Sequence, residues 1–276
     1  MKIFDVHTHV YPDKIAAAAL KKLREMSQNI PTFTEGTASD LEAKAKAAGY
    51  TGMLNCPVVT NAHQMYSVND WVAKMNAWPH LSLGGIFPDA PKVVEEIERI
   101  RSLGLLGLKF HPEYQEFYVL DEKMSPVWEY CAEHDFPVLF HAGSDIGFPG
   151  GHHSCPADFA VLARKFPKLT IICAHLGGWC NWDEVEAELA GSPVYLDTAF
   201  AKQWMRDPRQ FERIIRKHGV ERVLFGSDSP WSKLENAIAE VQETDLTDAE
   251  KQQIFWDNAD RLFKLTARAN ASGVSL

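Results

Sequence analysis

The chain has 276 residues, of which 46% are hydrophobic, and its formal net charge is −9. This length allows one large domain, because α/β barrels reach about 250 residues as a single unit. No run of Lys and Arg suits a phosphate backbone, which argues against a nucleic-acid partner, and no stretch approaches the roughly 20 apolar residues of a membrane helix. The opening MKIFDVHTH shows no signal-peptide pattern, so we expect a soluble cytoplasmic protein.

Short apolar runs alternate with longer amphipathic runs along the chain. Most short runs are continuously hydrophobic, which is typical of strands buried on both faces of a parallel sheet. The predicted strands are, in chain order, 2–6, 51–56, 81–87, 105–110, 137–140, 170–174, 194–197 and 222–225. The predicted helices after the first are 40–48, 69–78, 91–103, 125–134, 156–166, 182–190 and 208–218, and several of them begin with Pro or stop at Gly.

This alternation predicts an α/β protein with a closed (β/α)₈ barrel, built as a single domain over residues 1–270. A doubly wound open sheet is the alternative, but it would normally carry a Gly-rich phosphate loop after an early strand, and none is visible. Two extra helical stretches, 248–256 and 260–269, are expected to pack outside or under the barrel, and 271–276 to form a frayed tail. The polar connection 27–39 is a candidate lid.

Chemically active side chains follow five of the predicted strands. In a barrel, the C-terminal ends of the strands face the active-site mouth, so these side chains are expected to meet there. They are His7 and His9 after the first strand, Lys109 and His111 at the end of the fourth, His141 after the fifth, His175 after the sixth and Asp228 after the eighth.

His7 and His9 stand two residues apart and therefore point to the same side of a strand, where both imidazoles can bind one ion. Alone the pattern is weak, because two polar residues in a loop would look the same. With His141 and Asp228 at other strand ends, it predicts a four-ligand site for one divalent ion. Three imidazoles and a carboxylate suit Zn²⁺, our first expectation, and also Mn²⁺, Fe²⁺ or Co²⁺.

Two residues are predicted to be catalytic. Asp228 can bind the ion weakly and accept a proton from its water, although a carboxylate after a strand also caps turns. His175 titrates near neutrality, so it can polarise a carbonyl or move a proton. The alternatives for His175 are a hydrogen-bonded wall residue or a ligand of a second ion.

Lys109 and His111 are the candidate substrate-binding residues. Lys109 has three interpretations: a cation for a substrate carboxylate, which we favour, a carbamylated bridge between two metals, or a partner in a structural salt bridge. His111 is as well suited to hydrogen-bonding substrate as to supporting a metal ligand. Asp5, two residues before His7, is expected to orient a ligand histidine.

These residues, in this order, resemble the amidohydrolase superfamily. The closer likeness is to the amidohydrolase-related branch that includes aminocarboxymuconate-semialdehyde decarboxylase and the resorcylate-type decarboxylases. The motifs that carry it are Asp5-Val6-His7-Thr8-His9, Gly107-Leu108-Lys109-Phe110-His111-Pro112, Phe140-His141-Ala142-Gly143, Ala174-His175-Leu176-Gly177-Gly178, Gly226-Ser227-Asp228-Ser229-Pro230 and Asn258-Ala259-Asp260-Arg261-Leu262-Phe263.

The resemblance implies a distorted (β/α)₈ barrel with a divalent ion on His7, His9, His141 and Asp228, and a catalytic His175 near the metal-bound water. Binuclear members use a carbamylated lysine or a glutamate as a bridge. Because Lys109 stands two residues before His111, we favour one metal.

The leading functional expectation is hydrolysis of an amide, lactone or ester-like bond in a small carbonyl compound by a metal-activated water. The alternative is non-oxidative decarboxylation of a small aromatic or unsaturated carboxylic acid in the same site. Residue types do not separate the two reactions. A non-enzymatic metal-binding module is disfavoured, because Asp228 and His175 supply acid and base functions that binding alone does not need. A homo-oligomer stays open.

Overall fold

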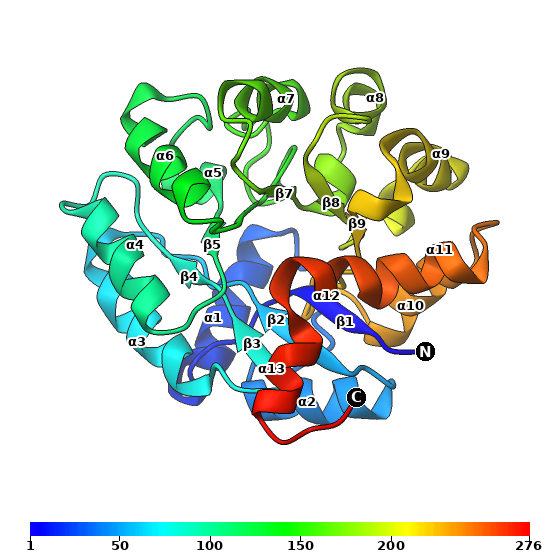
Figure 1. Ribbon diagram of the computed structural model, residues 1–276, viewed down its shortest axis with the longest axis horizontal. Helices are drawn as coiled ribbons and strands as arrows, with labels where there is room; N and C mark the ends of the chain where they lie inside the picture. The colour runs from blue at the N-terminus through cyan, green and yellow to red at the C-terminus, as the bar shows by residue number, and fades with distance from the viewer.

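Nine short parallel strands line the centre of the computed structural model, which describes residues 1–276 (Figure 1). The strands are β1 (Phe4–Thr8), β2 (Gly52–Asn55), β3 (His80–Ser82), β4 (Gly84–Gly85), β5 (Leu108–Phe110), β6 (Val138–Phe140), β7 (Ile171–Cys173), β8 (Tyr195–Asp197) and β9 (Val223–Leu224). Strands β1 to β3 pair in one sheet and β4 to β9 in another. Only Leu83 separates β3 from β4, so together they fill one position, and the wall is that of a (β/α)₈ barrel.

Hydrogen bonds between the first and last strands close the barrel. The amide of Val6 donates to the carbonyl of Phe225 at 2.8 Å, and the amide of Asp228 donates to the carbonyl of His7 at 2.8 Å. One step further, the amide of His9 donates to the carbonyl of Ser229 at 2.7 Å. This seam brings residues from opposite ends of the sequence side by side.

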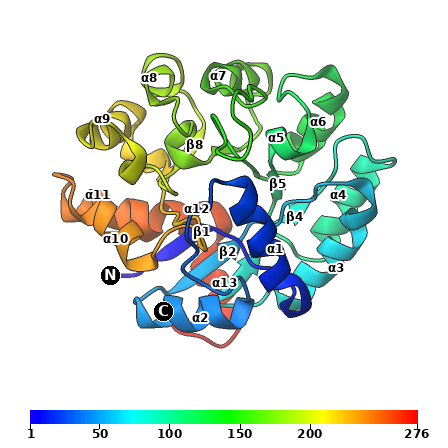
Figure 2. The same cartoon turned by 180° about the vertical axis from the view of Figure 1, so that it is seen from behind.

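Helices surround the strands on the outside of the barrel (Figures 1 and 2). Their bounds are α1 (Asp13–Met26), α2 (Ala38–Ala47), α3 (Met65–Met75), α4 (Val93–Ser102), α5 (Pro112–Gln115), α6 (Ser125–Glu133), α7 (Pro156–Lys165), α8 (Trp182–Glu184), α9 (Arg209–His218), α10 (Leu234–Gln242), α11 (Asp248–Gln252), α12 (Asn258–Phe263) and α13 (Leu265–Ala271). Single π-helical turns follow α8 at Val185–Leu189 and α11 at Gln253–Asp257. None of these helices is long and apolar enough to cross a membrane.

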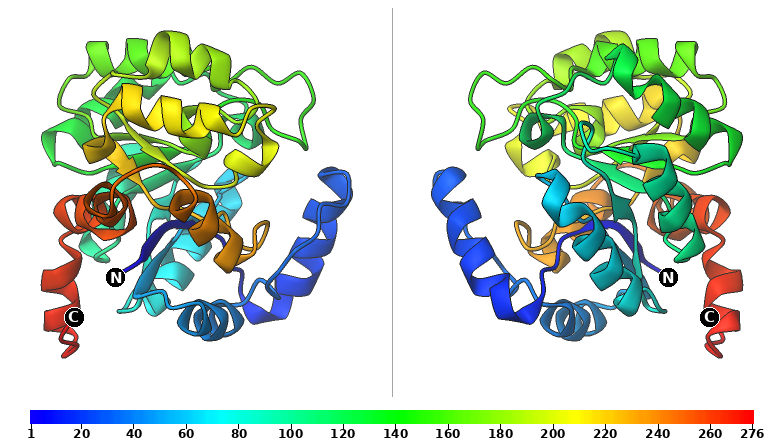
Figure 3. Two further views of the ribbon diagram at one scale, coloured as in Figure 1. Left: turned by 90° about the vertical axis from the view of Figure 1, so that its right-hand side faces the viewer. Right: turned by 90° about the vertical axis from the view of Figure 1, so that its left-hand side faces the viewer.

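The C-terminal helices close one end of the barrel and leave the other to the site. Trp256 packs against Phe4 and Trp78, with ring centroids 6.4 and 6.3 Å away. In Figure 3, α13 and α1 lie on opposite sides of the molecule. The expectation that the tail helices pack outside or under the barrel is therefore confirmed.

The core has two parts, one on each face of the barrel wall. A cluster of 54 buried residues joins the outer faces of the strands to the helices, and a second cluster of 15 buried residues includes Leu139 and Ile172. Leu139 is in register with Lys109 and with Ile172, so these three side chains share the inner face. The inner cluster supports the floor on which Lys109 stands.

Each of the eight predicted strand segments overlaps an observed strand. Most observed strands are shorter than expected, and β1 lies two residues further along the chain than the predicted 2–6. The predicted helices are also present, although 182–190 and 248–256 each change to a π-helical turn part-way, and 260–269 is divided at Lys264 into α12 and α13. Helix α10 was not predicted. Its sequence has no side-chain cap at Lys233, and it follows directly on the last strand-end loop, so the usual start signal is missing.

Candidate metal and substrate site

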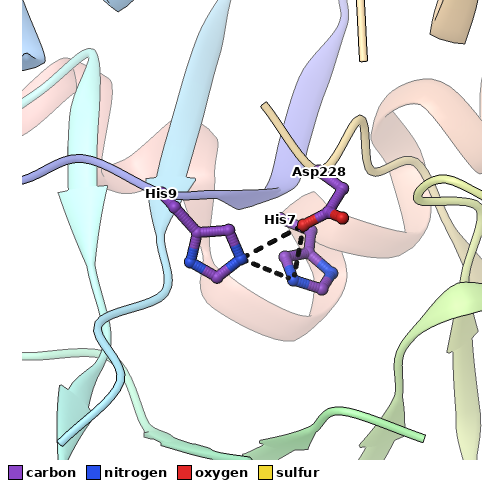
Figure 4. Close-up of side chains that lie close together, drawn as sticks. All are labelled: His7, His9 and Asp228. Carbon is purple, nitrogen blue, oxygen red and sulfur yellow. Dashed lines mark hydrogen bonds and ion pairs between the residues drawn. The ribbon is translucent and has the colours of Figure 1, made fainter. Parts of the chain in front are cut away.

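Three side chains converge at the seam between β1 and β9 (Figure 4). The Nε2 atoms of His7 and His9 are 3.2 Å apart. Asp228 Oδ1 lies 3.1 Å from Nε2 of His9 and 3.5 Å from Nε2 of His7. His7 and Asp228 are buried, and His9 is mostly buried, so the three donor atoms form a closed triangle away from bulk water.

The size of this triangle fits one divalent ion. Donor atoms about 2.1 Å from a shared ion lie about 3.0 Å apart at right angles and about 3.4 Å apart at the tetrahedral angle. The measured separations of 3.1 to 3.5 Å fall close to this range. Two imidazoles and a carboxylate are also a donor set that borderline divalent metals accept. The residues therefore fit a metal ion.

The backbone around the triangle is unusual in two ways. Strand β1 changes register against β2 between Asp5 and Thr8, so strict alternation does not extend from Asp5 to His7. Asp228 has a φ of 63°, in the left-handed region that non-glycine residues adopt uncommonly. A Cβ atom on Gly226 would lie 3.0 Å from the Cβ of His7, so the glycine lets the two strand ends approach closely.

Asp197, at the end of β8, fixes the ring of His7. Its Oδ2 accepts a hydrogen bond from Nδ1 of His7 at 2.9 Å, which leaves the Nε2 lone pair of His7 for a metal. The carbonyl of Cys56 does the same for His9, accepting from Nδ1 at 2.8 Å. Asp197 was missed in the sequence, although it ends a predicted strand and the strand-end rule applied to His141 would have found it.

Asp5 supports His7 through the backbone instead of the ring. Its Oδ1 accepts hydrogen bonds from the amides of His7 and Ser227, both at 3.0 Å. This carboxyl group therefore holds together the two strands of the seam. The expectation was instead that Asp5 would contact the ring of a ligand histidine. Burial raises the pKa of Asp5 and of Asp197 to about 7 in each case.

Lys109 is 1% exposed and forms no ion pair with a carboxylate. Its Nζ lies 3.3 Å from Nε2 of His7, at the edge of the candidate metal triangle. Burial lowers the pKa of the ammonium group. A buried cation without a carboxylate partner is costly, and a bound anion would remove that cost. The salt-bridge interpretation of Lys109 therefore has no support in the geometry.

His175 and His141 form a second contact beside the triangle. Nε2 of His175 lies 3.1 Å from Nδ1 of His141, and Nδ1 of His175 donates to the carbonyl of Ala199 at 3.0 Å. The other ring nitrogen of His141 faces the carbonyl of Ser144 at 3.1 Å. Both nitrogens of His141 are thus engaged away from the triangle, and ligation by this residue stays a prediction. Burial lowers the pKa of His175 to about 4.

His111 stacks on His141, with ring centroids 4.1 Å apart and an interplanar angle of 9°. Its Nε2 donates to Asp145 Oδ2 at 3.3 Å. Burial alone would raise the pKa of Asp145. The hydrogen bond from His111 outweighs this effect and holds the pKa of Asp145 below its usual value. Because the two rings are parallel, their lone pairs cannot converge on one ion, so this group is a poorer metal site than the triangle. Asp145, in a loop without periodicity, gave no sequence signal.

All seven predicted site residues line one cavity of about 190 Å³. This volume is below the range of about 300–1,000 Å³ typical of drug-sized ligand pockets, so the cavity suits a small molecule. Nine of the 20 residues that line the cavity are hydrophobic, among them Ile30, Trp179 and Trp231. Ser27 and Ile30 show that part of the predicted lid lies along the cavity.

The sequence profile of the family described as Amidohydrolase matches residues 4–265. The chain belongs to this amidohydrolase family. It is 24% identical over 220 residues to gamma-resorcylate decarboxylase from Polaromonas sp. strain JS666, an alignment that covers 64% of this chain and 68% of that protein.

Solved structures support the fold of this amidohydrolase. A TIM-barrel protein from Bordetella bronchiseptica has a TM-score of 0.72 and 16% identity, covering 97% of this chain and all of that one. The dihydroxybenzoic acid decarboxylase from Polaromonas sp. JS666, solved with bound manganese and 2-nitroresorcinol, has a TM-score of 0.70 and 18% identity, covering 96% and 97% of the two chains. The 5-carboxyvanillate decarboxylase from Sphingomonas paucimobilis has a TM-score of 0.67 and 17% identity, covering 95% and 99%.

These relatives correct the functional expectation. Hydrolysis was the leading reading of the sequence, and the relatives with a named activity are decarboxylases of aromatic acids. The error has a physical cause, because a metal, a carboxylate and a histidine serve either reaction. Zinc, the first metal expected, also finds no support, since the metal in the Polaromonas enzyme is manganese.

Proposed function

We propose that this amidohydrolase is a metal-dependent decarboxylase of a small aromatic carboxylic acid. One observation carries the proposal: the His7, His9 and Asp228 triangle lies beside the buried amino group of Lys109, which has no carboxylate partner, in a small cavity whose wall includes several aromatic side chains. A planar acid fits this combination, with its carboxylate at the cationic end and its ring against the apolar wall. The relatives named above support the reaction type.

The residues of the cavity have distinct parts in this reaction. Lys109 binds the substrate carboxylate, while Trp179 and Trp231 hold the ring and exclude water from it. The bond between the ring carbon and the carboxylate breaks, its electron pair stays on that carbon, and CO₂ leaves. A proton taken up from solvent then bonds to the same carbon, and we assign its delivery to Asp228 and His175, which line the cavity beside Lys109.

We further propose that the resident ion is a single Mn²⁺ held by His7, His9 and Asp228, with His141 as the predicted fourth ligand. When bound, the ion supplies positive charge that fixes a substrate oxygen and stabilises the developing negative charge. One ion is favoured because the triangle is the cluster whose donor atoms converge. Nitrogen and oxygen donors suit manganese as they suit zinc, so supply and geometry decide between them.

The test is incubation of the manganese-loaded protein in D₂O with a panel of ring carboxylic acids that includes 2,6-dihydroxybenzoate. The proposal predicts CO₂ release and a product with one deuterium on the carbon that carried the carboxylate. The variant His9→Ala should lose both the ion and the activity. The control variant Asp89→Asn, which changes an exposed residue outside the cavity, should keep both. A metal-loaded protein that releases CO₂ from none of these acids would show that the proposed reaction is wrong.

A further inference from the structure

The loop 143–155, between β6 and α7, forms one wall of the cavity and is held in place by few contacts. Asp145, Ile146 and Gly147 line the cavity. No residue from 144 to 153 is buried, and no backbone group of 145–153 hydrogen-bonds to backbone outside the loop. A segment with so few buried contacts opens locally at low free energy.

The two ends of this loop are fixed, so only its middle is free to move. The amide of Gly143 donates to the carbonyl of Ser154 at 2.8 Å, and Oγ of Ser154 donates to the carbonyl of Gly143 at 3.1 Å. The amide of Ser144 donates to the carbonyl of Trp179 at 2.9 Å. The middle segment, 145–153, therefore lies between two anchored ends.

Two side chains in or beside α5 hold the middle segment against the barrel. Oε1 of Glu113 accepts from the amide of His153 at 2.8 Å, and Oε2 accepts from Nδ1 of the same residue at 2.6 Å. Nε2 of His111 lies 3.3 Å from Oδ2 of Asp145. Glu113 is 3% exposed, and a Cβ atom on Gly151 would collide with its carboxylate, so the loop lies directly on this group. A buried carboxylate that accepts its hydrogen bonds from the loop strongly favours the closed position.

Helix α5, which carries Glu113, is itself anchored in the barrel. The side chain of Gln115 is 1% exposed and accepts from the amide of His111 at 2.9 Å. It also donates to the carbonyls of Val59 and Ile86, at 2.8 and 2.7 Å, in the segments that follow β2 and β4. The contact between Glu113 and His153, here called the latch, therefore joins a fixed helix to a weakly held loop.

The loop also meets the end of α1. A Cβ atom on Gly147 would lie 3.8 Å from the carbonyl of Met26, the last residue of α1, and Leu23 of the same helix lines the cavity. We propose that 145–153 is a gate for the cavity and that Glu113 is a positioning residue, which holds the gate closed through His153. Closing the gate also places Asp145 against His111, so the latch completes the cavity wall.

The inference rests on the proposed function in one respect, which is that a small ring acid enters the cavity from solution. Hydrogen exchange of the manganese-loaded protein tests the latch without any acid. His153→Phe keeps a ring beside Tyr118, whose centroid is 4.6 Å from that of His153, and removes the Nδ1 donor. The amides of 145–152 should then exchange at least about tenfold faster, because a charge-assisted hydrogen bond is lost.

The matched control is His152→Phe, which changes the exposed neighbour of His153 in the same loop and should leave the exchange of 145–152 unchanged. Two variants of Glu113 separate a latch from general damage. Glu113→Ala removes both acceptors. Glu113→Gln keeps one acceptor for the amide of His153, and its NH₂ group can donate to Nδ1 once the ring proton moves to Nε2. Exchange of the loop should be fastest in Glu113→Ala and intermediate in Glu113→Gln, while exchange of the strand amides stays as in the native chain.

Stopped-flow fluorescence with benzoate then tests the gate, because Trp179 and Trp231 line the cavity. If the acid passes only through the open loop, a weaker latch raises the association and dissociation rate constants by the same factor. His153→Phe should therefore raise both about tenfold and leave their ratio, the dissociation constant, nearly unchanged. Damage to the cavity wall would instead weaken binding through faster dissociation alone.

Two results would overturn the inference. One is native-like exchange of 145–152 in both His153→Phe and Glu113→Ala, since it would show that the latch does not hold the loop. The other is faster loop exchange without a rise in both rate constants, since it would show that the loop is not the gate. A native chain that binds neither benzoate nor another ring acid contradicts the proposed function, whereas the exchange measurement decides by itself whether Glu113 holds the loop.

Discussion

Replacing Asp197 with Asn tests whether the ring of His7 is set for metal binding. Asp197 accepts from Nδ1 of His7 through Oδ2, and from the amides of His175 and Ala199 through Oδ1, at 2.9, 3.0 and 3.0 Å. The side-chain amide of Asn has one acceptor oxygen and one NH₂ donor, so it cannot accept hydrogen bonds at both positions. If the NH₂ group faces His7, Nδ1 of His7 must accept, and the ring proton moves to Nε2, where it blocks the ion. If the amide has the opposite orientation, its NH₂ group faces the backbone amide donors of His175 and Ala199.

Either orientation carries a free-energy cost whose magnitude can be estimated. A buried donor left without an acceptor costs about 1–3 kcal/mol, and the loss of a carboxylate that orients a ligand histidine typically lowers metal affinity about 10–100-fold. For Asp197→Asn we therefore expect a loss of about 1.4–2.7 kcal/mol in metal binding. The matched control is Asp5→Asn, since Asp5 is also buried but accepts from the backbone amides of His7 and Ser227 through one oxygen alone.

The assay is calorimetric titration of the metal-free proteins with Mn²⁺, with circular dichroism to check that each variant is folded. Asp197→Asn should bind Mn²⁺ at least about tenfold more weakly than Asp5→Asn. Equal affinities in folded proteins would refute the reasoning, because they would show that the tautomer of His7 does not depend on Asp197.

Three further predictions concern the metal, the substrate cation and the core. Dialysis against EDTA should abolish CO₂ release, and Mn²⁺ added back at about 100 times its dissociation constant should stabilise the fold by about 2.7 kcal/mol in urea unfolding; activity that survives metal removal would contradict the site. Lys109→Met should raise KM for the acid at least about tenfold while Mn²⁺ still binds, since the variant loses a charge-assisted contact of about 1.5–3 kcal/mol; an unchanged KM would remove Lys109 from substrate binding. Trp128→Ala should lower the free energy of unfolding by about 3–5 kcal/mol, because its ring is buried between Phe110 and Phe140; a loss below about 1 kcal/mol would contradict the packing.

The fold was predictable because its strands are short apolar runs between amphipathic helices. The spacing of hydrophobic residues distinguishes strands from helices without any knowledge of tertiary contacts. The interruption between β3 and β4 was not predictable, because 81–87 reads as one run and the break at Leu83 depends on which neighbouring strand offers hydrogen bonds. The register shift in β1 is of the same kind, since its cause lies in the pairing with β2.

The candidate site was predictable in its location and less so in its geometry. The strand-end rule gathered seven residues that line one cavity. It could not give the direction of a ring, and His141 has both nitrogens engaged with His175 and Ser144. Tyr11 and Asp145 lie in loops, where the sequence has no hydrophobic periodicity that would single out a site residue. The reaction was beyond the sequence for a simpler reason: the same donors can activate water or hold a carboxylate.

The seam between β1 and β9 has a consequence for how the protein acquires its ion. His9 and Asp228 are separated by 219 residues in the sequence, and their side chains meet only where the first strand pairs with the last. A growing chain that has not yet released its C-terminal segment contains two of the three converging ligands and lacks the third. If the triangle holds the ion as proposed, high-affinity metal uptake requires completed barrel closure, and a truncated or half-folded chain should bind the ion only weakly. Metal binding would then be coupled to the last step of folding.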